Sequence, residues 1–114
     1  MHEMSIALGI VQLAEKKARE SNAQYISKIN IQIGTLSGIE IDSFEFAWPL
    51  AVKETLLEKA VKILDVVPAK AKCSDCNHDF DIHNIYDACP KCGSYFKHIY
   101  QGKELKVKYI EIEK

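Results

Sequence analysis

Two pairs of cysteines constrain this sequence more than any other feature. The first pair is Cys73-x2-Cys76 and the second is Cys89-x2-Cys92, with twelve residues between the pairs. These are the four cysteines of the chain, and the segment that holds them has no helical period. Two such turns that face each other can set four thiolates tetrahedrally around one Zn²⁺. We therefore predict a zinc ribbon whose metal is structural, because four protein ligands leave no open position for a reaction.

Disulfides and redox chemistry are the alternative interpretations of these cysteines. A redox motif explains one CxxC pair and leaves the other unexplained. Disulfides belong to secreted proteins, and the apolar run "MSIALGIVQLA" lacks the features of a signal peptide. No Lys or Arg precedes it, and "EKKARE" follows without a small-residue cleavage site. We therefore expect a cytoplasmic protein, and we interpret His78 and His83 as loop residues rather than ligands.

The sequence before the cysteines predicts a helix, a strand and a second helix. Helical spacing predicts a helix over about residues 3–21, ended by Asn22, whose first turns are apolar nearly all round and should be well covered. Isoleucines that alternate with polar residues from Ile29 to Ile33 predict a half-buried strand. Asp42, with Glu45 three residues later, resembles a capping box that opens the second helix. Two apolar stripes are expected on the first helix (Met4, Ala7, Leu8, Val11, Ala14, Ala18; and Ile6, Ile10, Leu13), and one on the second (Phe44, Ala47, Trp48, Ala51, Val52).

Proline and strand signals divide the rest of the chain. Pro49 lies within the second helical pattern, so we expect a kink or an early end there. Residues 60–68 and 104–113 read as strands, the latter with a bulge where its alternation changes phase. The predicted fold class is α+β: two helices on a small three-stranded sheet, with an inserted four-cysteine zinc-ribbon module. The predicted domains are 1–68 plus 103–114 and the ribbon, 69–102, which we judge too small for a core of its own.

Composition argues against several functions. The chain has 114 residues, a formal net charge of −1 and no apolar run of the roughly 20 residues that a bilayer span needs. We therefore expect neither nucleic acid nor membrane as a partner. The alternative interpretation is a zinc-ribbon module for nucleic-acid or protein interaction. Lysines and aromatic residues in the ribbon favour it, but acidic residues between them weaken the case. No HExxH or P-loop pattern is present, so we predict that the protein is not an enzyme.

The whole chain resembles the HypA/HybF family of hydrogenase nickel-incorporation proteins. Four stretches carry the resemblance, in the expected order: "MHEMS" at the N-terminus, then "VPAKAKCSDC", "CPKCGS" and "GKELKVKYIEIE". The resemblance implies a nickel metallochaperone that serves the maturation of nickel–iron hydrogenase. It also implies two partners, a HypB-like GTPase and the precursor of the hydrogenase large subunit.

The N-terminus "MHE" has the donors for a nickel site. Met1 should be retained, because the large His2 side chain follows it. The α-amine of Met1, the backbone nitrogen of His2 and the His2 ring can close two adjacent chelate rings on one ion. A fourth donor, the Glu3 backbone nitrogen or side chain, would complete the square-planar, nitrogen-rich set that suits Ni²⁺.

Each of these residues also has a simpler interpretation. His2 can be a frayed chain end, and the resemblance favours the nickel site over that interpretation. Glu3 can be an acidic first-turn residue that suits the helix dipole, or a contact for the partner. His98, in "YFKHIY", is interpreted first as a partly buried strand histidine. The sharper hypothesis is that His98 joins the nickel ligands.

Overall fold

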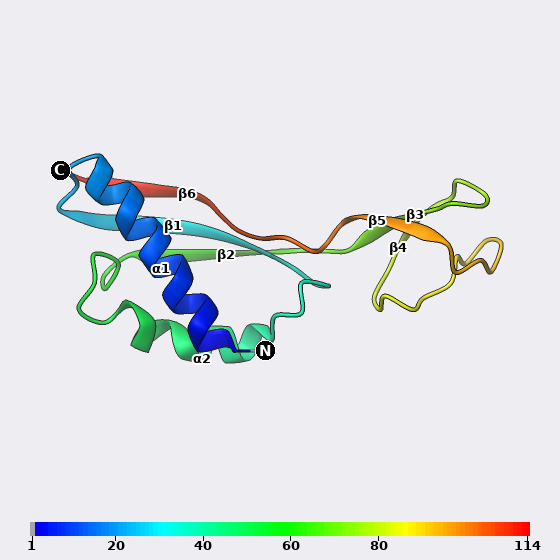
Figure 1. Cartoon of the computed structure of the whole chain (residues 1–114), viewed down its shortest axis with the longest axis horizontal. Coiled ribbons are helices and arrows are strands. Elements are labelled where there is room, and N and C mark those ends of the chain that lie inside the picture. The colour runs from blue at the N-terminus through cyan, green and yellow to red at the C-terminus, as the bar shows by residue number, and fades with distance from the viewer. Residues whose placement is uncertain (1) are drawn as a thin grey trace. The chain divides into compact units, whose positions relative to one another are not determined.

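In a computed structural model that describes residues 2–114, the chain forms two helices and six strands (Figure 1). By their packing, the residues fall into two compact units. The first comprises the segment up to Gln32, Ile39–Asp65 and Lys106–Lys114; the second comprises Ile33–Gly38 and Val66–Leu105. The elements are, in order, α1 (Glu3–Glu20), β1 (Tyr25–Gly34), α2 (Ile41–Val52), β2 (Val61–Val67), β3 (Lys70–Cys73), β4 (Asp79–Asp81), β5 (Lys97–Gln101) and β6 (Leu105–Glu113).

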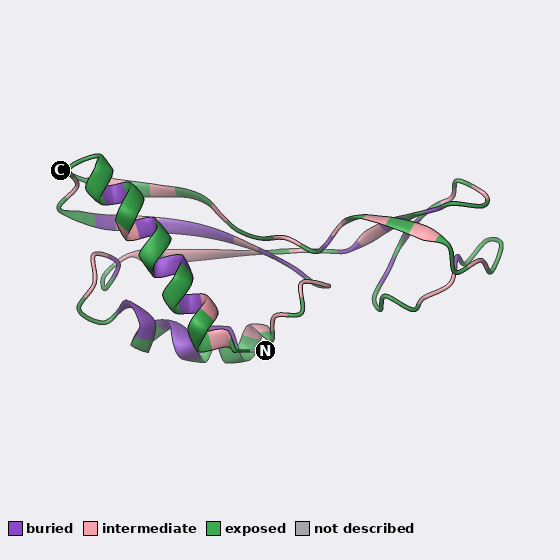
Figure 2. Ribbon diagram, viewed as in Figure 1, coloured by how far each residue is buried: buried purple, intermediate pink, exposed green. Residues whose placement is uncertain are grey.

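Helix α1 buries one side and exposes the other (Figure 2). Its end is the one predicted: Asn22 has a φ of +59°, and the N–H groups of Asn22 and Ala23 donate to the carbonyls of Arg19 and Ala18. These bonds form a Schellman motif, which satisfies carbonyls that the last turn leaves free. The expectation that the first turns are well covered is wrong, because Leu8 is 42% exposed. The buried residues of α1 are Ala7, Ile10, Val11, Ala14 and Ala18.

The sheet of the first unit has the strand order β2-β1-β6, so the last strand returns to pair with the first. Ile29, Ile31 and Ile33 of β1 are fully buried, as their alternation predicts, but the intervening Asn30 is only 4% exposed, so the strand is not half-buried there. In β6 the half-buried positions change phase between Val107 and Ile110, where the sequence predicts a bulge. The three-stranded sheet and the predicted strands are therefore confirmed.

Helix α2 differs from its prediction at its start. The N-cap residue is Glu40, and no side chain of the cap makes the capping bond. The predicted capping box of Asp42 and Glu45 is wrong: Asp42 lies inside the first turn, and Glu45 forms an ion pair with Lys62 of β2. The helix continues for three residues beyond Pro49, which lies at an exposed position. The predicted inward face is confirmed, since Phe44, Ala47, Trp48, Ala51 and Val52 are buried.

The second unit contains a separate sheet with the order β4-β3-β5. Both pairings are antiparallel: Lys72 of β3 is the register partner of Asp79 on one side and of His98 on the other. Contrary to expectation, this small unit has an apolar cluster. Its buried members are Ala69, Ala71, Cys73, Phe80, Ile82 and Cys89. Two of the four cysteines therefore serve as core residues as well as ligand candidates.

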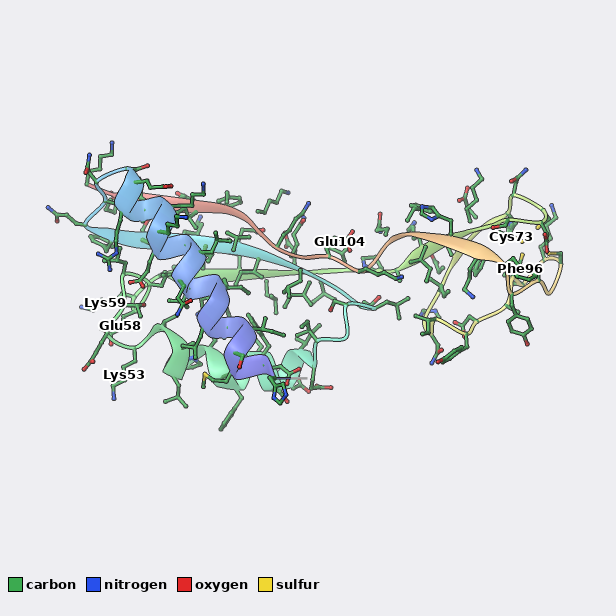
Figure 3. All side chains as sticks on the ribbon, in the orientation of Figure 1. Lys53, Glu58, Lys59, Cys73, Phe96 and Glu104 are labelled. Carbon is green, nitrogen blue, oxygen red and sulfur yellow. The ribbon has the colours of Figure 1, made fainter. Side chains whose placement is uncertain are left out.

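A close backbone approach joins three segments of the second unit. Gly102 has a φ of +112°, and a Cβ added there would lie 2.4 Å from the Cα of Ala69. A Cβ at Gly34 would lie 2.0 Å from the carbonyl oxygen of Gly102. The N–H of Gly34 donates to the carbonyl of Glu104 (labelled in Figure 3) at 2.7 Å, and the N–H of Leu36 donates to that of Gly102 at 2.7 Å. Only glycine permits this packing at residues 34 and 102.

The two packed units and the predicted domains differ at their edges. The segments Ile33–Gly38 and Val66–Pro68 pack with the ribbon, whereas the sequence assigned them to the α+β body. Because packing does not show which segments fold independently, the domain ranges stay a prediction. Within residues 2–114, no helix is both long enough and apolar enough to cross a bilayer.

Candidate metal centres

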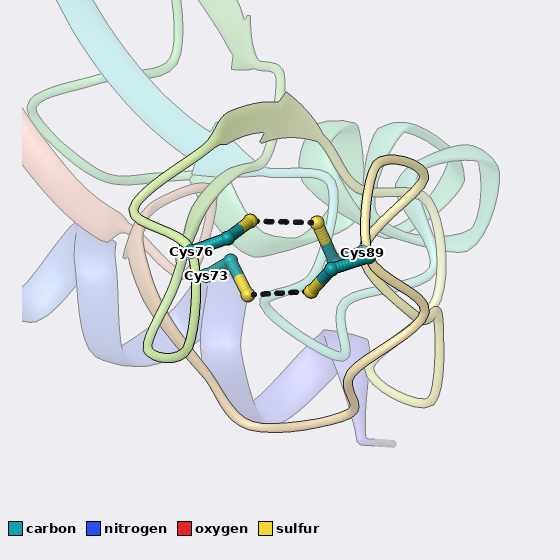
Figure 4. Close-up of side chains that lie close together, drawn as sticks. Cys73, Cys76 and Cys89 are labelled. Atoms are coloured by element: carbon teal, nitrogen blue, oxygen red, sulfur yellow. Dashed lines mark hydrogen bonds between the residues drawn. The ribbon is translucent and has the colours of Figure 1, made fainter.

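The four cysteines meet at one point in the second unit (Figure 4). All four sulfurs lie within 4.8 Å of one another. The sulfurs of Cys73 and Cys92 are 3.5 Å apart, and those of Cys76 and Cys89 are 3.7 Å apart. Cys73 and Cys89 are buried, Cys76 is half-buried and Cys92 is exposed. The centre therefore lies against the small apolar cluster and reaches the surface at Cys92.

Two backbone turns of the same geometry present these sulfurs. In the first, the N–H of Cys73 donates to the carbonyl of His78, and the N–H of Asn77 donates to the carbonyl of Cys73. In the second, the N–H of Cys89 donates to Ser94 and the N–H of Gly93 donates to Cys89, at the same two sequence offsets. The residue after each second cysteine has a positive φ, +63° at Asn77 and +77° at Gly93. Asn and Gly are the residues that adopt this conformation at least cost.

The spacing of the sulfurs fits a tetrahedral thiolate site. A disulfide requires sulfurs about 2.05 Å apart, so neither close pair is a disulfide. Four sulfurs at about 2.3 Å from one Zn²⁺ would be about 3.8 Å apart along the edges of a tetrahedron. The distances of 3.5 and 3.7 Å are close to that edge. The residues present therefore fit Zn²⁺, and Cys73, Cys76, Cys89 and Cys92 would hold it.

The thiols of the cluster perturb one another's pKa values, because neighbouring negative thiolates repel each other. Burial raises the pKa of the Cys89 thiol, but the N–H groups of Cys92 and Lys91 and the neighbouring thiols lower it more, to about 7. For Cys92 the Ser94 N–H lowers the pKa, whereas the Cys73 thiol and burial raise it, to about 12. The first thiolate therefore forms readily, whereas its negative charge and burial oppose ionisation of the remaining thiols. A divalent cation would neutralise that charge as it displaces the remaining protons, so its binding should depend on pH.

One contact across the centre was not foreseen from the sequence. The Ser94 hydroxyl, beside the second turn, donates to the carboxylate of Asp75, which lies inside the first turn. This hydrogen bond links the two cysteine turns at the surface. Nothing in the spacing of the sequence predicts it, because the pairing depends on how the two turns face each other.

The N-terminal candidates lie in the first unit, and Met1 lies outside the described residues. His2 is exposed and is the N-cap residue of α1, with φ −91° and ψ +78°. Its carbonyl accepts the N–H of Ile6 at 3.1 Å, whereas its ring makes no capping bond. The half-buried Glu3 has a partner instead: its Oε2 accepts the backbone N–H of Glu40 at 3.1 Å.

The other histidines lie in the second unit. His98 is exposed on β5, so the interpretation as a partly buried strand histidine is wrong. It lines a shallow hollow with Lys72, Asp79 and Tyr100. His78 is half-buried and stacks on Phe80 with 6.4 Å between the ring centroids, and His83 is exposed. In the described part of the chain, the cysteines are the only cluster of three or more metal-binding side chains.

These features define a class: a small protein in which a four-cysteine ribbon is joined to an α+β unit. Comparison with known families identifies the member of that class. The family described as "Hydrogenase/urease nickel incorporation, metallochaperone, hypA" matches residues 1–112. The chain belongs to the HypA family of nickel-incorporation metallochaperones.

Individual relatives agree with this assignment. The chain is 44% identical to the hydrogenase maturation factor HypA of Parabacteroides distasonis, covering 100% of this chain and 99% of that protein. It is 43% identical to the protein of that name from Francisella philomiragia, over 96% and 97% of the two chains. The solution structure of the nickel metallochaperone HypA from Helicobacter pylori has a TM-score of 0.69 and 28% identity, over 99% of this chain and 98% of that one. The predicted α+β fold with a four-cysteine ribbon is thereby confirmed.

Proposed function

We propose that this protein binds Ni²⁺ at its N-terminus and delivers it for the maturation of nickel–iron hydrogenase, while its four cysteines hold a structural Zn²⁺. The observation that best supports the nickel site is that the His2 side chain is exposed and makes no capping bond. The residue lies at the very start of α1. The imidazole is therefore available to a ligand without the loss of an interaction within the fold.

The backbone at this position is equally available. The first N–H groups of a helix have no acceptor within the helix, so deprotonating one to bind a metal breaks no helical bond. The proposed donors are the α-amine of Met1, the backbone nitrogen and ring of His2, and a fourth donor from Glu3. Nitrogen-rich sites of this kind suit Ni²⁺. Because the ion must displace protons, nickel affinity should rise with pH, and the ion should be released as pH falls.

The cysteine centre has the opposite properties, which support a structural role. Its sulfurs are spaced for one tetrahedral ion, and two of them belong to the apolar cluster of the ribbon. An ion with four thiolate ligands has no open coordination position. We therefore propose that neither metal serves catalysis and that the protein is not an enzyme. Four free thiols are in keeping with a cytoplasmic protein.

Delivery requires partners, and the surface beside the nickel site is suited to one. Met4 and Leu8 of α1 are 36% and 42% exposed, close in sequence to the acidic Glu3. We propose that this surface contacts a HypB-like GTPase and that nickel then passes to the precursor of the hydrogenase large subunit.

Leu8→Asp should weaken association with the GTPase about tenfold, measured by calorimetry, with exposed Glu20→Lys as the control. Unchanged affinity would remove α1 from the interface.

The decisive experiment compares the native protein with a version that carries one extra residue before Met1. The extension keeps every side chain but converts the α-amine into a peptide nitrogen and shifts the chelate register. Native nickel binding should be lost, while zinc content and circular dichroism stay unchanged. If the extended protein bound Ni²⁺ with native affinity and spectrum, the amine would be excluded. The ligands would then come from side chains elsewhere, and His98 would be the first to test.

A further inference from the structure

We propose that Glu3 is a positioning residue: its carboxylate completes the N-terminal cap of α2 and thereby fixes the first turn of α1, which presents His2. The inference rests on the proposed nickel site and assigns a role to the Glu3 side chain within it. The observation behind it is the hydrogen bond from the Glu40 N–H to Glu3 Oε2, at 3.1 Å. It joins the starts of two helices 37 residues apart in sequence.

The donor in this bond is the one that a capping box would use. Glu40 is the N-cap residue of α2, and its carbonyl accepts the Phe44 N–H at 2.9 Å as the helix begins. In a capping box, a Glu or Gln at the third helical position reaches back to the N–H of the N-cap residue. That position in α2 is Ser43, whose side chain is too short for the same reach. A carboxylate from a different helix, that of Glu3, accepts the N–H instead.

Electrostatics favours the same arrangement. Glu3 lies in the first turn of α1, where the partial positive charge of the helix N-terminus stabilises a carboxylate. Through Glu40 it also lies at the N-terminus of α2, so two helix dipoles act on one carboxylate. Glu45, which the sequence suggested as the acidic member of a capping box, forms an ion pair with Lys62 of β2 instead. The Glu3 carboxylate is thus the group that is available and placed for this N–H.

This contact changes the interpretation of Glu3 at the nickel site. Glu3, the first helical residue of α1 and the one that directly follows the exposed His2, is held at a fixed point on α2, so the start of the helix from which His2 extends is fixed in place. Preorganisation of this kind raises affinity by removing conformations that binding would otherwise have to exclude. The side chain of Glu3 therefore acts through His2, and its carboxylate is not a nickel ligand. The Glu3 backbone nitrogen remains the proposed fourth donor.

The first test examines the contact without nickel. The amide of Glu40 is followed by ¹⁵N–¹H NMR and hydrogen exchange in the full-length protein and in three variants. Glu3→Ala removes the acceptor, so the Glu40 amide should shift and exchange faster. Glu3→Gln keeps an oxygen that can accept the bond, and the amide should stay protected. Glu20→Ala, on the exposed last turn of α1, removes one negative charge elsewhere and should change neither property.

The second test measures nickel itself, by calorimetry and by the visible absorption of bound Ni²⁺. Glu3→Ala should weaken binding about tenfold, the factor that corresponds to one charge-assisted hydrogen bond. Glu3→Gln should restore affinity to within about threefold of native. The absorption bands at saturation should be native in both variants, because the ligands are the same. A purely structural role would lower thermal stability and leave nickel affinity unchanged.

Three further results would overturn the proposal. Altered absorption bands in both variants would make the carboxylate a ligand, and equal loss of affinity in Glu3→Gln and Glu3→Ala would make its charge the active property. An unshifted Glu40 amide in Glu3→Ala would show that the contact does not exist in solution. Failure of the nickel site itself gives a different result. In that case His2→Ala binds Ni²⁺ as native protein does, while the Glu40 amide still responds to Glu3→Ala.

Discussion

The two candidate metal regions of this protein are built in opposite ways. The cysteine centre is largely enclosed: its candidate ligands come from two backbone turns of the same geometry, and two of the four cysteines are buried in an apolar cluster, whereas Cys92 is exposed. The N-terminal region is open: an exposed histidine precedes the first helix, and its ring makes no capping bond. An enclosed site holds its ion because release requires unfolding, whereas an open site can exchange its ion while the fold persists. The contrast matches the proposed roles of structural zinc and transported nickel.

Removal of a cysteine ligand is the strongest test of this contrast. Cys73→Ala should abolish stoichiometric zinc and unfold the ribbon, because structural zinc contributes about 10–16 kcal/mol in small modules. The α+β unit should persist, since its core of helices and sheet is separate. Metal analysis and ¹⁵N–¹H NMR would show loss of zinc and of ribbon signals only. An ordered ribbon with full zinc in Cys73→Ala would show that the centre is not structural.

The complementary change at the open site should leave the fold intact. His2→Ala removes the imidazole and one chelate ring, so nickel affinity should fall by more than about 100-fold, since even outer-shell partners contribute about 10–100-fold. His2→Gln should fail similarly, because an amide is a poor Ni²⁺ ligand at neutral pH. Nickel calorimetry beside zinc analysis and thermal unfolding checks the separation. Loss of zinc or of folding in His2→Ala would mean that the two regions depend on each other.

Two glycine substitutions test how strongly the stability of the ribbon depends on the close backbone packing at Gly102. Gly102→Ala places a Cβ 2.4 Å from Ala69 at a φ of +112°, and it should destabilise the protein by about 2–3 kcal/mol. Gly93→Ala is the matched control: its φ is +77°, but nothing lies within 4 Å of the added Cβ. It should cost about 1 kcal/mol. Urea unfolding measures both, and equal losses would show that the clash at Ala69 relaxes freely.

The smallest expected effect concerns the end of α1 that is far from nickel in the sequence. At residue 22, where φ is +59°, alanine lacks the short polar side chain that lets asparagine adopt this conformation at little cost. Asn22→Ala should therefore lower the free energy of unfolding in urea by about 1 kcal/mol. Asn22→Gly should match or exceed native stability. Nickel affinity should be native in both variants. A change in affinity would mean that the start of α1 responds to the stability of the whole helix.

Much of this protein follows from local pattern. The spacing within Cys73-x2-Cys76 and within Cys89-x2-Cys92 predicts two pairs of metal ligands, because the two cysteines of each pair lie on one tight turn. Alternation in β1 and the helical stripes of α1 and α2 predict elements that the structure confirms, because apolar residues at the spacing of a helix or strand face one side of it. The Asn22 stop is equally local, because a left-handed residue can end a helix by itself.

The errors of prediction arise where two elements meet. The capping box at Asp42 and Glu45 fits the sequence rule, yet β2 supplies Lys62 as a partner for Glu45. His98 lies in an alternating run, but the ribbon sheet exposes its face of β5. Leu8 belongs to an apolar stripe and stays exposed, because the helix and sheet it packs on cover only part of the helix circumference. In each case the outcome depends on a neighbour that is distant in sequence.

By itself the sequence determined which side chains could bind metal and which segments of the α+β unit would become helices and strands, but not the three strands of the ribbon. These properties depend on residue type and on spacing within a few positions. Only the tertiary structure decided how those ligand groups are held. It brought the two cysteine turns face to face, and it closed Gly102 onto Ala69. It also placed the Glu3 carboxylate on the Glu40 N–H, because hydrogen bonds and packing between distant segments exist only once the chain has folded.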